Sequence, residues 1–286
     1  MIPYAPPRAA KDIPVIDLTG TFVSDDARED AARLIHRACR ETGFFYVSGH
    51  GIDPLLVESQ LAAARRFFAQ SDGAKQAVSK AHSPHWRGYE GVGAQVLDAG
   101  SAADHKESFA IAIDLAEDDP LVVAGGPGQG PNLWPEHLPG FREQMLAYQG
   151  AMIDLGRHLM GLIAMSVDLD YGYFAAGLDQ PQCGVRLLRY PPQPHDGSDN
   201  VLGAGAHSDW GSITILLQDG KAGLEVRNAA GEWILATPIP GTFVINIGQM
   251  VERFTAGVYR ANLHRVRNGS PDAARYSVVS FFELEP

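Results

Sequence analysis

The order of apolar and polar residues divides the chain into two parts. Before about residue 180 the spacing is mostly helical, with amphipathic segments over Asp25–Thr42, from Asp53 to about Gln70, and over Pro139–Val167. Two shorter stretches, Ile13–Leu18 and Gly43–Ile52, have the composition of strands. We therefore expect helices packed around a few strands in this part.

From Gln182 onward the pattern changes to short β-rich runs separated by Gly, Pro, Asn and Asp. These runs are CGVRLLRY, SITILLQ, GLEVRN, GEWILA, GTFVINIG and YSVVSFFEL. Many short strands with turn signals between them indicate an antiparallel sandwich or jelly roll. We predict a mainly β fold with flanking helices, in one domain over residues 1–286. Residues 1–180 form a mostly helical buttress, and 181–286 form the jelly-roll core.

Charge and composition limit the classes of partner that this protein can bind. The 286-residue chain has a formal net charge of −11, which disfavours nucleic acid and anionic membrane surfaces. Two cysteines suit a reducing compartment, the first residues lack the apolar core of a signal peptide, and no apolar run is long enough to span a bilayer. We expect a cytoplasmic protein with a small-molecule partner; the oligomeric state stays open.

Three side chains form a candidate metal site. His207 and Asp209 lie two residues apart at the mouth of the run SITILLQ, so an extended backbone puts both on one face. His264 follows far enough along the chain to return across the sheet. Two imidazoles and one carboxylate are the facial triad of non-heme Fe(II) oxygenases, which leaves positions for a co-substrate and O₂. The alternative is a surface turn with structural histidines.

Basic and hydroxyl side chains alternate toward the same interior. In the run ARYSVVSFF, Arg275 and Ser277 lie two residues apart and so share one face of the strand. In VRLLRY, Arg186 shares a face with Tyr190. A guanidinium inside a β core is costly unless it meets an anion, and its fork matches a carboxylate. The alternative is that both arginines sit at strand ends and pair with surface acids.

Several motifs in a fixed order carry a resemblance to a known family. They are IPVIDL, ETGFFYVSGHGI, RGY, HKESF, RLLRYPP, HSDWGSITILLQD, GLEV, NIGQM, the HRV that begins at His264, and RYS. In these the chain resembles the isopenicillin N synthase-like branch of the Fe(II)/2-oxoglutarate-dependent oxygenases.

The resemblance implies a double-stranded β-helix in which His207, Asp209 and His264 bind iron. It also implies that Arg275 and Ser277 hold the distal carboxylate of 2-oxoglutarate, with Tyr190 assisting. The expected reaction consumes O₂, oxidises a C–H bond by hydroxylation, desaturation or ring formation, and releases succinate and CO₂.

Departures from the family pattern leave alternatives open. Leu188 stands where many relatives have asparagine, and Gln249 where many have aspartate. Arg186 then has two candidate roles, in the 2-oxoglutarate pocket or on a carboxylate of an anionic or amino-acid-like substrate. The RxS pair also occurs in members that do not use 2-oxoglutarate. An iron oxidase of that kind, or a ligand-binding jelly roll without turnover, is therefore the alternative, whereas a zinc hydrolase would lack a general base.

Three finer expectations complete the set. Lys106 and Glu107 in HKESF should form an internal ion pair. Trp210 should pack beside the metal site, with a contact to the substrate as the alternative. Relatives usually continue past the RYS strand with a C-terminal helical segment that closes over the site. We therefore expect either a trimmed chain or an unusually open cavity.

Overall fold

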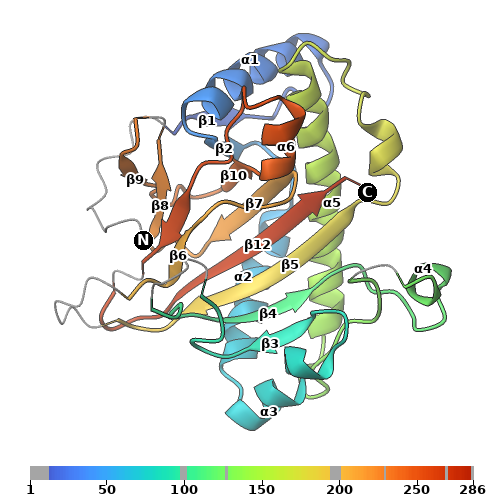
Figure 1. Ribbon diagram of the computed structural model, residues 1–286, viewed down its shortest axis with the longest axis vertical. Coiled ribbons are helices and arrows are strands. Elements are labelled where there is room, and N and C mark those ends of the chain that lie inside the picture. Colours follow the sequence, from blue (N-terminus) through green and yellow to red (C-terminus); the bar gives the residue numbers. More distant parts are fainter. Residues whose placement is uncertain are drawn as a thin grey trace.

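The computed structural model describes residues 13–96, 102–125, 128–193, 201–228, 230–267 and 270–284. Its described strands form two sheets, and helices cover one face of the larger sheet (Figure 1). The larger sheet has the order β1-β2-β10-β7-β12-β5-β4-β3, and the smaller has the order β6-β11-β8-β9. No helix in these ranges is long and apolar enough to cross a bilayer.

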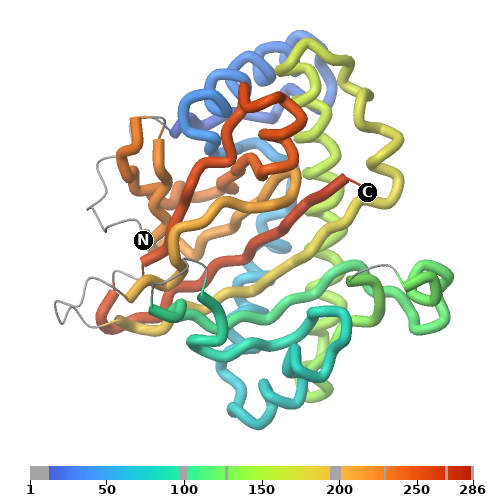
Figure 2. Tube along the Cα trace, viewed as in Figure 1, coloured from blue at the N-terminus to red at the C-terminus, as the bar shows by residue number. Residues whose placement is uncertain are grey.

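The larger sheet combines strands from both halves of the sequence. Figure 2 shows early strands running beside late ones: β2 lies next to β10, and β4 next to β5. Apart from the parallel pair β1 and β2, neighbouring strands are antiparallel. The strand bounds are β1 (Val15–Asp17), β2 (Phe44–Ser48), β3 (Gly88–Glu90), β4 (Glu107–Ile111), β5 (Gln182–Tyr190), β7 (Ile213–Gln218), β10 (Phe243–Ile247) and β12 (Arg275–Glu283).

The smaller sheet is built from short strands that face the larger one. Its members are β6 (Ala204–His207), β8 (Leu224–Arg227), β9 (Trp233–Leu235) and β11 (His264–Val266), all paired antiparallel. Because β11 pairs with β6 in a register that sets His264 opposite His207, this sheet brings residues from distant parts of the sequence together.

Local sequence signals account for the ends of α1 and for the start of α2. In α1, Ser24 caps the first turn, and Gly43 follows the last turn at φ +69°, where a Cβ would lie 2.3 Å from the Arg260 carbonyl oxygen. Asp53 caps α2, with Pro54 at its first position. The helices are α1 (Asp25–Glu41), α2 (Pro54–Phe68), α3 (Asp72–Ala77), α4 (Pro120–Val123), α5 (Phe141–Met165) and α6 (Gln249–Phe254), with 3₁₀ turns at Lys80–His82 and Ala175–Leu178.

The two faces of the larger sheet pack against different partners. On β12, Val278 and Phe282 belong to the main core, where α1, α2 and α5 cover the sheet. Val279, between them, belongs to a second cluster that lies against the smaller sheet. This alternation follows from the two-residue period of a strand. It leaves one row of side chains on each central strand directed into the space between the sheets.

The predicted fold class is confirmed, and so are the three long helices and the six β runs of the second half. Sequence reasoning missed β3, β4 and the short strands β6 and β11 as separate elements. The last two span only a few residues each, so they carry little periodic signal. The division into residues 1–180 and 181–286 stays a prediction, although strands from both parts share the larger sheet.

Candidate active site

Two histidines and an aspartate converge at one end of the space between the sheets. His207 ends β6, His264 begins β11, and Asp209 follows in the connection from β6 to β7. Asp209 Oδ1 lies 3.7 Å from Nε2 of each histidine, and the two ring centroids are 4.2 Å apart. The three candidate ligand atoms all lie within 4.8 Å of one another. One ion can therefore contact all three.

The surroundings hold His207 and Asp209 in the protonation states that a cation requires. Burial, followed by the neighbouring imidazole of His264, lowers the pKa of His207 to about 4. His207 Nδ1 lies 2.7 Å from the Gly205 carbonyl oxygen. Since a carbonyl only accepts, Nδ1 carries the proton and Nε2 presents its lone pair. The donor set, two imidazole nitrogens and a carboxylate oxygen, fits a divalent transition metal.

Two neighbours fix the carboxylate of Asp209. Thr214 Oγ1 and Asn246 Nδ2 donate to its Oδ2 at 2.6 and 2.8 Å, which leaves Oδ1 facing the histidines. Burial by itself raises the pKa of Asp209, but the two histidines and these hydrogen bonds outweigh it and keep the pKa below its ordinary value. The carboxylate is thus ionised and oriented with one oxygen free for an ion.

Deeper in the same space lies the guanidinium of Arg275. The side chain is 0% exposed; its Nε donates to the Lys221 carbonyl and one Nη to Gln218 Oε1. Its other Nη and the hydroxyl of Ser277 are buried without a hydrogen-bond partner among the described residues. Tyr190 lies beside them, with its ring 5.1 Å from the guanidinium. A charged donor and a hydroxyl left open in this way suit a carboxylate.

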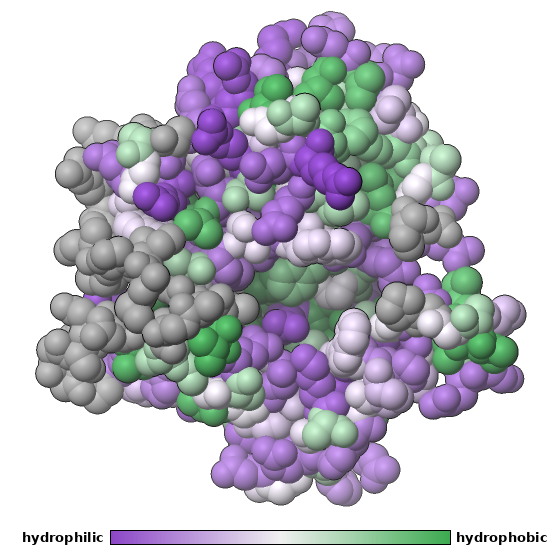
Figure 3. All heavy atoms as spheres, in the orientation of Figure 1, coloured by the Kyte–Doolittle hydropathy of each residue, from purple (hydrophilic) through white to green (hydrophobic). Residues whose placement is uncertain are grey.

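One cavity contains both groups. Its volume is about 200 Å³, and its lining includes the metal triad, Arg275, Ser277, Tyr190 and Arg186. Figure 3 shows the corresponding face of the molecule hollowed in its centre, over β5 and β12, with apolar residues at the bottom. All seven side chains singled out from the sequence therefore line a single cavity.

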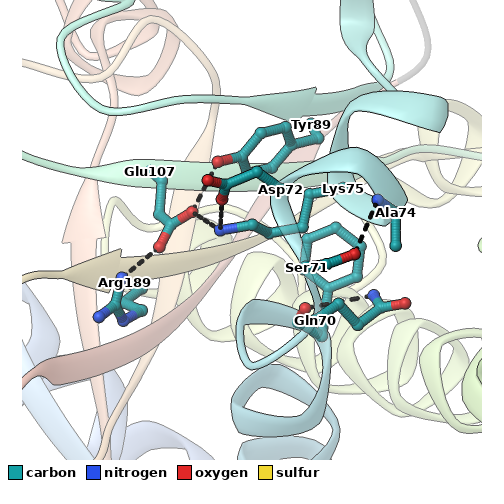
Figure 4. A network of polar contacts seen from close by, with 9 residues as sticks. Gln70, Ser71, Asp72, Ala74, Lys75, Tyr89, Glu107 and Arg189 are labelled. Atoms are coloured by element: carbon teal, nitrogen blue, oxygen red, sulfur yellow. Dashed lines mark hydrogen bonds and ion pairs between the residues drawn. The ribbon is translucent and has the colours of Figure 1, made fainter.

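Trp210 and Lys106 do not behave as expected. Trp210 lines the cavity as expected but is 65% exposed, so it is not packed there, and its place favours the alternative of a contact with the substrate. Lys106 Nζ pairs with Asp104 at 2.5 Å and also lines the cavity. Glu107, the next residue on a strand, points to the opposite face and contacts Lys75, Tyr89 and Arg189 (Figure 4). The predicted pair Lys106–Glu107 is wrong because adjacent strand residues face opposite sides.

Comparisons with known proteins agree with this geometry. A model described as "2OG-Fe(II) oxygenase superfamily" matches residues 181–284, and one described as "non-haem dioxygenase in morphine synthesis N-terminal" matches residues 13–137. The chain belongs to the 2OG-Fe(II) oxygenase superfamily. Its members use Fe(II), 2-oxoglutarate and O₂. This 2OG-Fe(II) oxygenase is 34% identical to the 2-oxoglutarate-Fe(II) type oxidoreductase hxnY of Emericella nidulans, over 100% of this chain and 81% of that protein.

Other relatives extend the likeness to structure. The oxygenase is 38% identical to the 2-oxoglutarate-dependent dioxygenase citB of Monascus ruber, over 95% of this chain and 84% of the relative. It also resembles a Neurospora crassa protein solved in complex with alpha-KG and thymine, at a TM-score of 0.82 and 28% identity. That alignment covers 95% of this chain and 86% of the Neurospora crassa chain. The protein is therefore a 2-oxoglutarate-dependent dioxygenase with a double-stranded β-helix fold.

Sequence reasoning missed the residues that support the site. Thr214 and Asn246 hold Asp209, and Gln218 holds Arg275. Asn246 gave a usable signal, because a polar residue inside the apolar run FVINI needs a partner when buried. Gln218 gave none, since it ends its strand like an ordinary surface residue.

Proposed function

We propose that His207, Asp209 and His264 hold Fe(II), and that Arg275 binds the distal carboxylate of 2-oxoglutarate with Ser277 and Tyr190. One observation supports this assignment above the others. The open donors of Arg275 and Ser277 and the three converging ligand atoms lie in one cavity. A metal-binding module without turnover has no need for the open donors of Arg275 and Ser277.

In this proposal the chain positions and shields the reactants. Iron with 2-oxoglutarate and O₂ supplies the oxidising power for C–H bonds. Thr214 and Asn246 hold Asp209 so that one oxygen faces the metal, and the Gly205 carbonyl sets the tautomer of His207. Arg275 neutralises a co-substrate carboxylate in a dry interior, where a charge–charge contact is strong.

The substrate in this proposal is a small, anionic or amino-acid-like molecule. The basic Arg186 in the cavity wall supports an anionic molecule. The cavity volume of about 200 Å³, and the related Neurospora crassa protein solved with thymine, support only its small size. We further propose that residues 1–286 act as one oxygenase domain. A cytoplasmic location is proposed on Cys39 and Cys183, which are both free thiols.

Succinate formation per O₂ consumed tests the proposed site. Protein loaded anaerobically with Fe(II) and then given 2-oxoglutarate and O₂ should form one succinate for each O₂ consumed, and a panel of candidate substrates should stimulate the rate. His207→Ala and His264→Ala should each abolish succinate formation because they remove a ligand. Full activity of both alanine variants would exclude these residues as ligands.

A further inference from the structure

We infer that Arg186 binds the substrate rather than 2-oxoglutarate, and that the substrate is a monocarboxylic acid with an apolar body. This inference rests on the proposed function, because it requires Arg275 to be the site of the co-substrate. It decides between the two roles that the sequence leaves to Arg186 and narrows the substrate class.

Arg186 lacks the partner that a cation inside a protein normally has. Its side chain lines the cavity, and its Nε is buried without a hydrogen-bond partner in the described part of the chain. The ring of Phe281 lies 5.7 Å from its guanidinium carbon, and the carboxylates of Glu90 and Asp209 act on its charge without a hydrogen bond to it. By contrast, the buried Arg265 has Glu225 at 2.6 Å. A guanidinium without a hydrogen-bonded carboxylate in a cavity wall is prepared for an anion that arrives.

The strand register separates Arg186 from the co-substrate. On the paired strands β5 and β12, Tyr190 lies opposite Arg275, and Arg186 lies opposite Val279. Four residues of strand correspond to about 13 Å. The side chain of Arg186 also extends away from Arg275, because it reaches the ring of Phe281, which is farther from Arg275 along β12 than Val279 is. 2-Oxoglutarate spans only about 5 Å between its carboxylate carbons, so a molecule held by Arg275 does not reach Arg186.

The charges of the metal, 2-oxoglutarate and the lining side chains sum to one excess positive charge. The double charge of Fe(II) and the single charges of Asp209 and Arg275 together balance the two carboxylates of 2-oxoglutarate. Lys106, which also lines the cavity, is balanced by Asp104, whose other oxygen accepts from the Gly205 amide. Arg186 remains. One surplus charge fits one carboxylate, whereas a phosphate monoester would bring more negative charge than the described lining offsets.

The lining also argues against an amino acid. A substrate ammonium would need an acidic partner, and among the described lining residues Asp209 is the sole carboxylate. Its oxygens are committed to the metal, Thr214 and Asn246. The walls next to Arg186 are Val279, Phe281 and Leu188. A carboxylate on Arg186 with an apolar body along these side chains satisfies both kinds of surface.

The test compares carboxylic acids with their uncharged amides. Calorimetry would measure the binding of benzoate, phenylacetate, 3-phenylpropionate and hexanoate, and of the four matching amides, to protein saturated with Mn(II) and 2-oxoglutarate. Mn(II) replaces iron so that no turnover occurs. At least one acid should bind about 10- to 100-fold more tightly than its amide, the range of a hydrogen bond to a charged group.

Variants assign this preference to a residue. Arg186→Met keeps the apolar stem and should make acid and amide bind equally, with the Kd for 2-oxoglutarate unchanged. Arg186→Lys should retain part of the preference. Arg275→Met should raise the Kd for 2-oxoglutarate and leave the preference for acid over amide unchanged. Arg227→Met is the control, because Arg227 lies on β8 outside the cavity lining. It should change neither the acid–amide preference nor the Kd for 2-oxoglutarate.

The outcomes separate the two proposals. If wild-type protein binds no acid more tightly than its amide, or if Arg186→Met weakens 2-oxoglutarate and keeps the preference, this inference is overturned. The acid–amide comparison in wild type holds even if Arg186→Met does not fold. Failure of the proposed function gives a different result, because Mn(II) and 2-oxoglutarate then do not bind to the wild-type cavity at all.

Discussion

At the residue scale, the candidate site depends on how one carboxylate is held. Asp209 is buried beside two histidines, a position that costs free energy unless a cation and hydrogen bonds compensate. Its Oδ2 receives both available donors, from Thr214 and Asn246. In the proposed site, Asp209 is therefore oriented by residues that would not themselves contact the metal.

Replacing either donor should weaken metal binding. Thr214→Val and Asn246→Leu should each raise the Kd for Fe(II) about 10- to 100-fold, the usual effect of removing a hydrogen bond to a metal ligand. An anaerobic titration with Fe(II) measures this, and thermal unfolding checks that each variant is folded. Thr242→Val is the control, since that hydroxyl donates to a backbone carbonyl outside the cavity. Unchanged affinity in both variants would show that Asp209 orients itself without them.

At the element scale, a buried ionic cluster joins the first half of the chain to the sheet. Glu107 on β4 accepts from Lys75 of α3 at 3.0 Å and from Tyr89 of β3 at 2.7 Å, and it also pairs with Arg189 of β5 (Figure 4). The cluster lies on the face of the sheet opposite the cavity. It therefore acts on stability and not on chemistry.

Glu107→Gln should destabilise the protein in a pH-dependent way. Burial raises the pKa of Glu107, but the three partners outweigh burial and hold it below its ordinary value of 4.5. The stabilisation is therefore complete above pH 4.5 and is lost as pH falls through the lower folded-state pKa. Removing this charge should cost about 3 kcal/mol at pH 7.

Urea unfolding at pH 7, 5 and 3.5 measures the difference in the free energy of unfolding between wild type and Glu107→Gln. This difference should be smallest at pH 3.5. Asp72→Asn is the matched control, because its carboxylate contacts the same lysine at 3.2 Å but is exposed. It should cost less than about 1 kcal/mol. A difference for Glu107→Gln that does not depend on pH would contradict the role of its charge.

The same cluster shows where sequence reasoning reaches its limit. The two-residue period of HKESF is enough to place Lys106 and Glu107 on opposite faces. It does not say which distant residues lie there, because Lys75 and Arg189 come from other elements. The triad and Arg275 were predictable, since their residue types are hard to explain inside a β core. Their supports, Thr214 and Gln218, look like ordinary strand residues until the sheets are paired.

At the scale of the whole molecule, the proposed metal site joins strands that are distant in the sequence. His207 and His264 lie on neighbouring strands of the smaller sheet, and Asn246, which holds Asp209, lies on the larger. An ion bound here therefore links the two sheets across the cavity. The fold class followed from periodicity, whereas this linkage followed only from the strand register.

Metal binding should accordingly stabilise the fold. Addition of Mn(II) at about 100 times its Kd should raise the free energy of unfolding by about 2.7 kcal/mol, and chelation should reverse the effect. Differential scanning calorimetry with and without the ion measures the shift. His264→Ala should show no comparable gain. A gain of equal size in that variant would place the ion elsewhere.

The most direct test is a crystal structure of the protein with Mn(II) and 2-oxoglutarate, grown without O₂. The anomalous signal of manganese should lie within about 2.3 Å of Nε2 of His207, Oδ1 of Asp209 and Nε2 of His264. The distal carboxylate of 2-oxoglutarate should contact Arg275 and Ser277. A manganese peak away from these atoms, or a co-substrate carboxylate bound to Arg186, would contradict the proposed site.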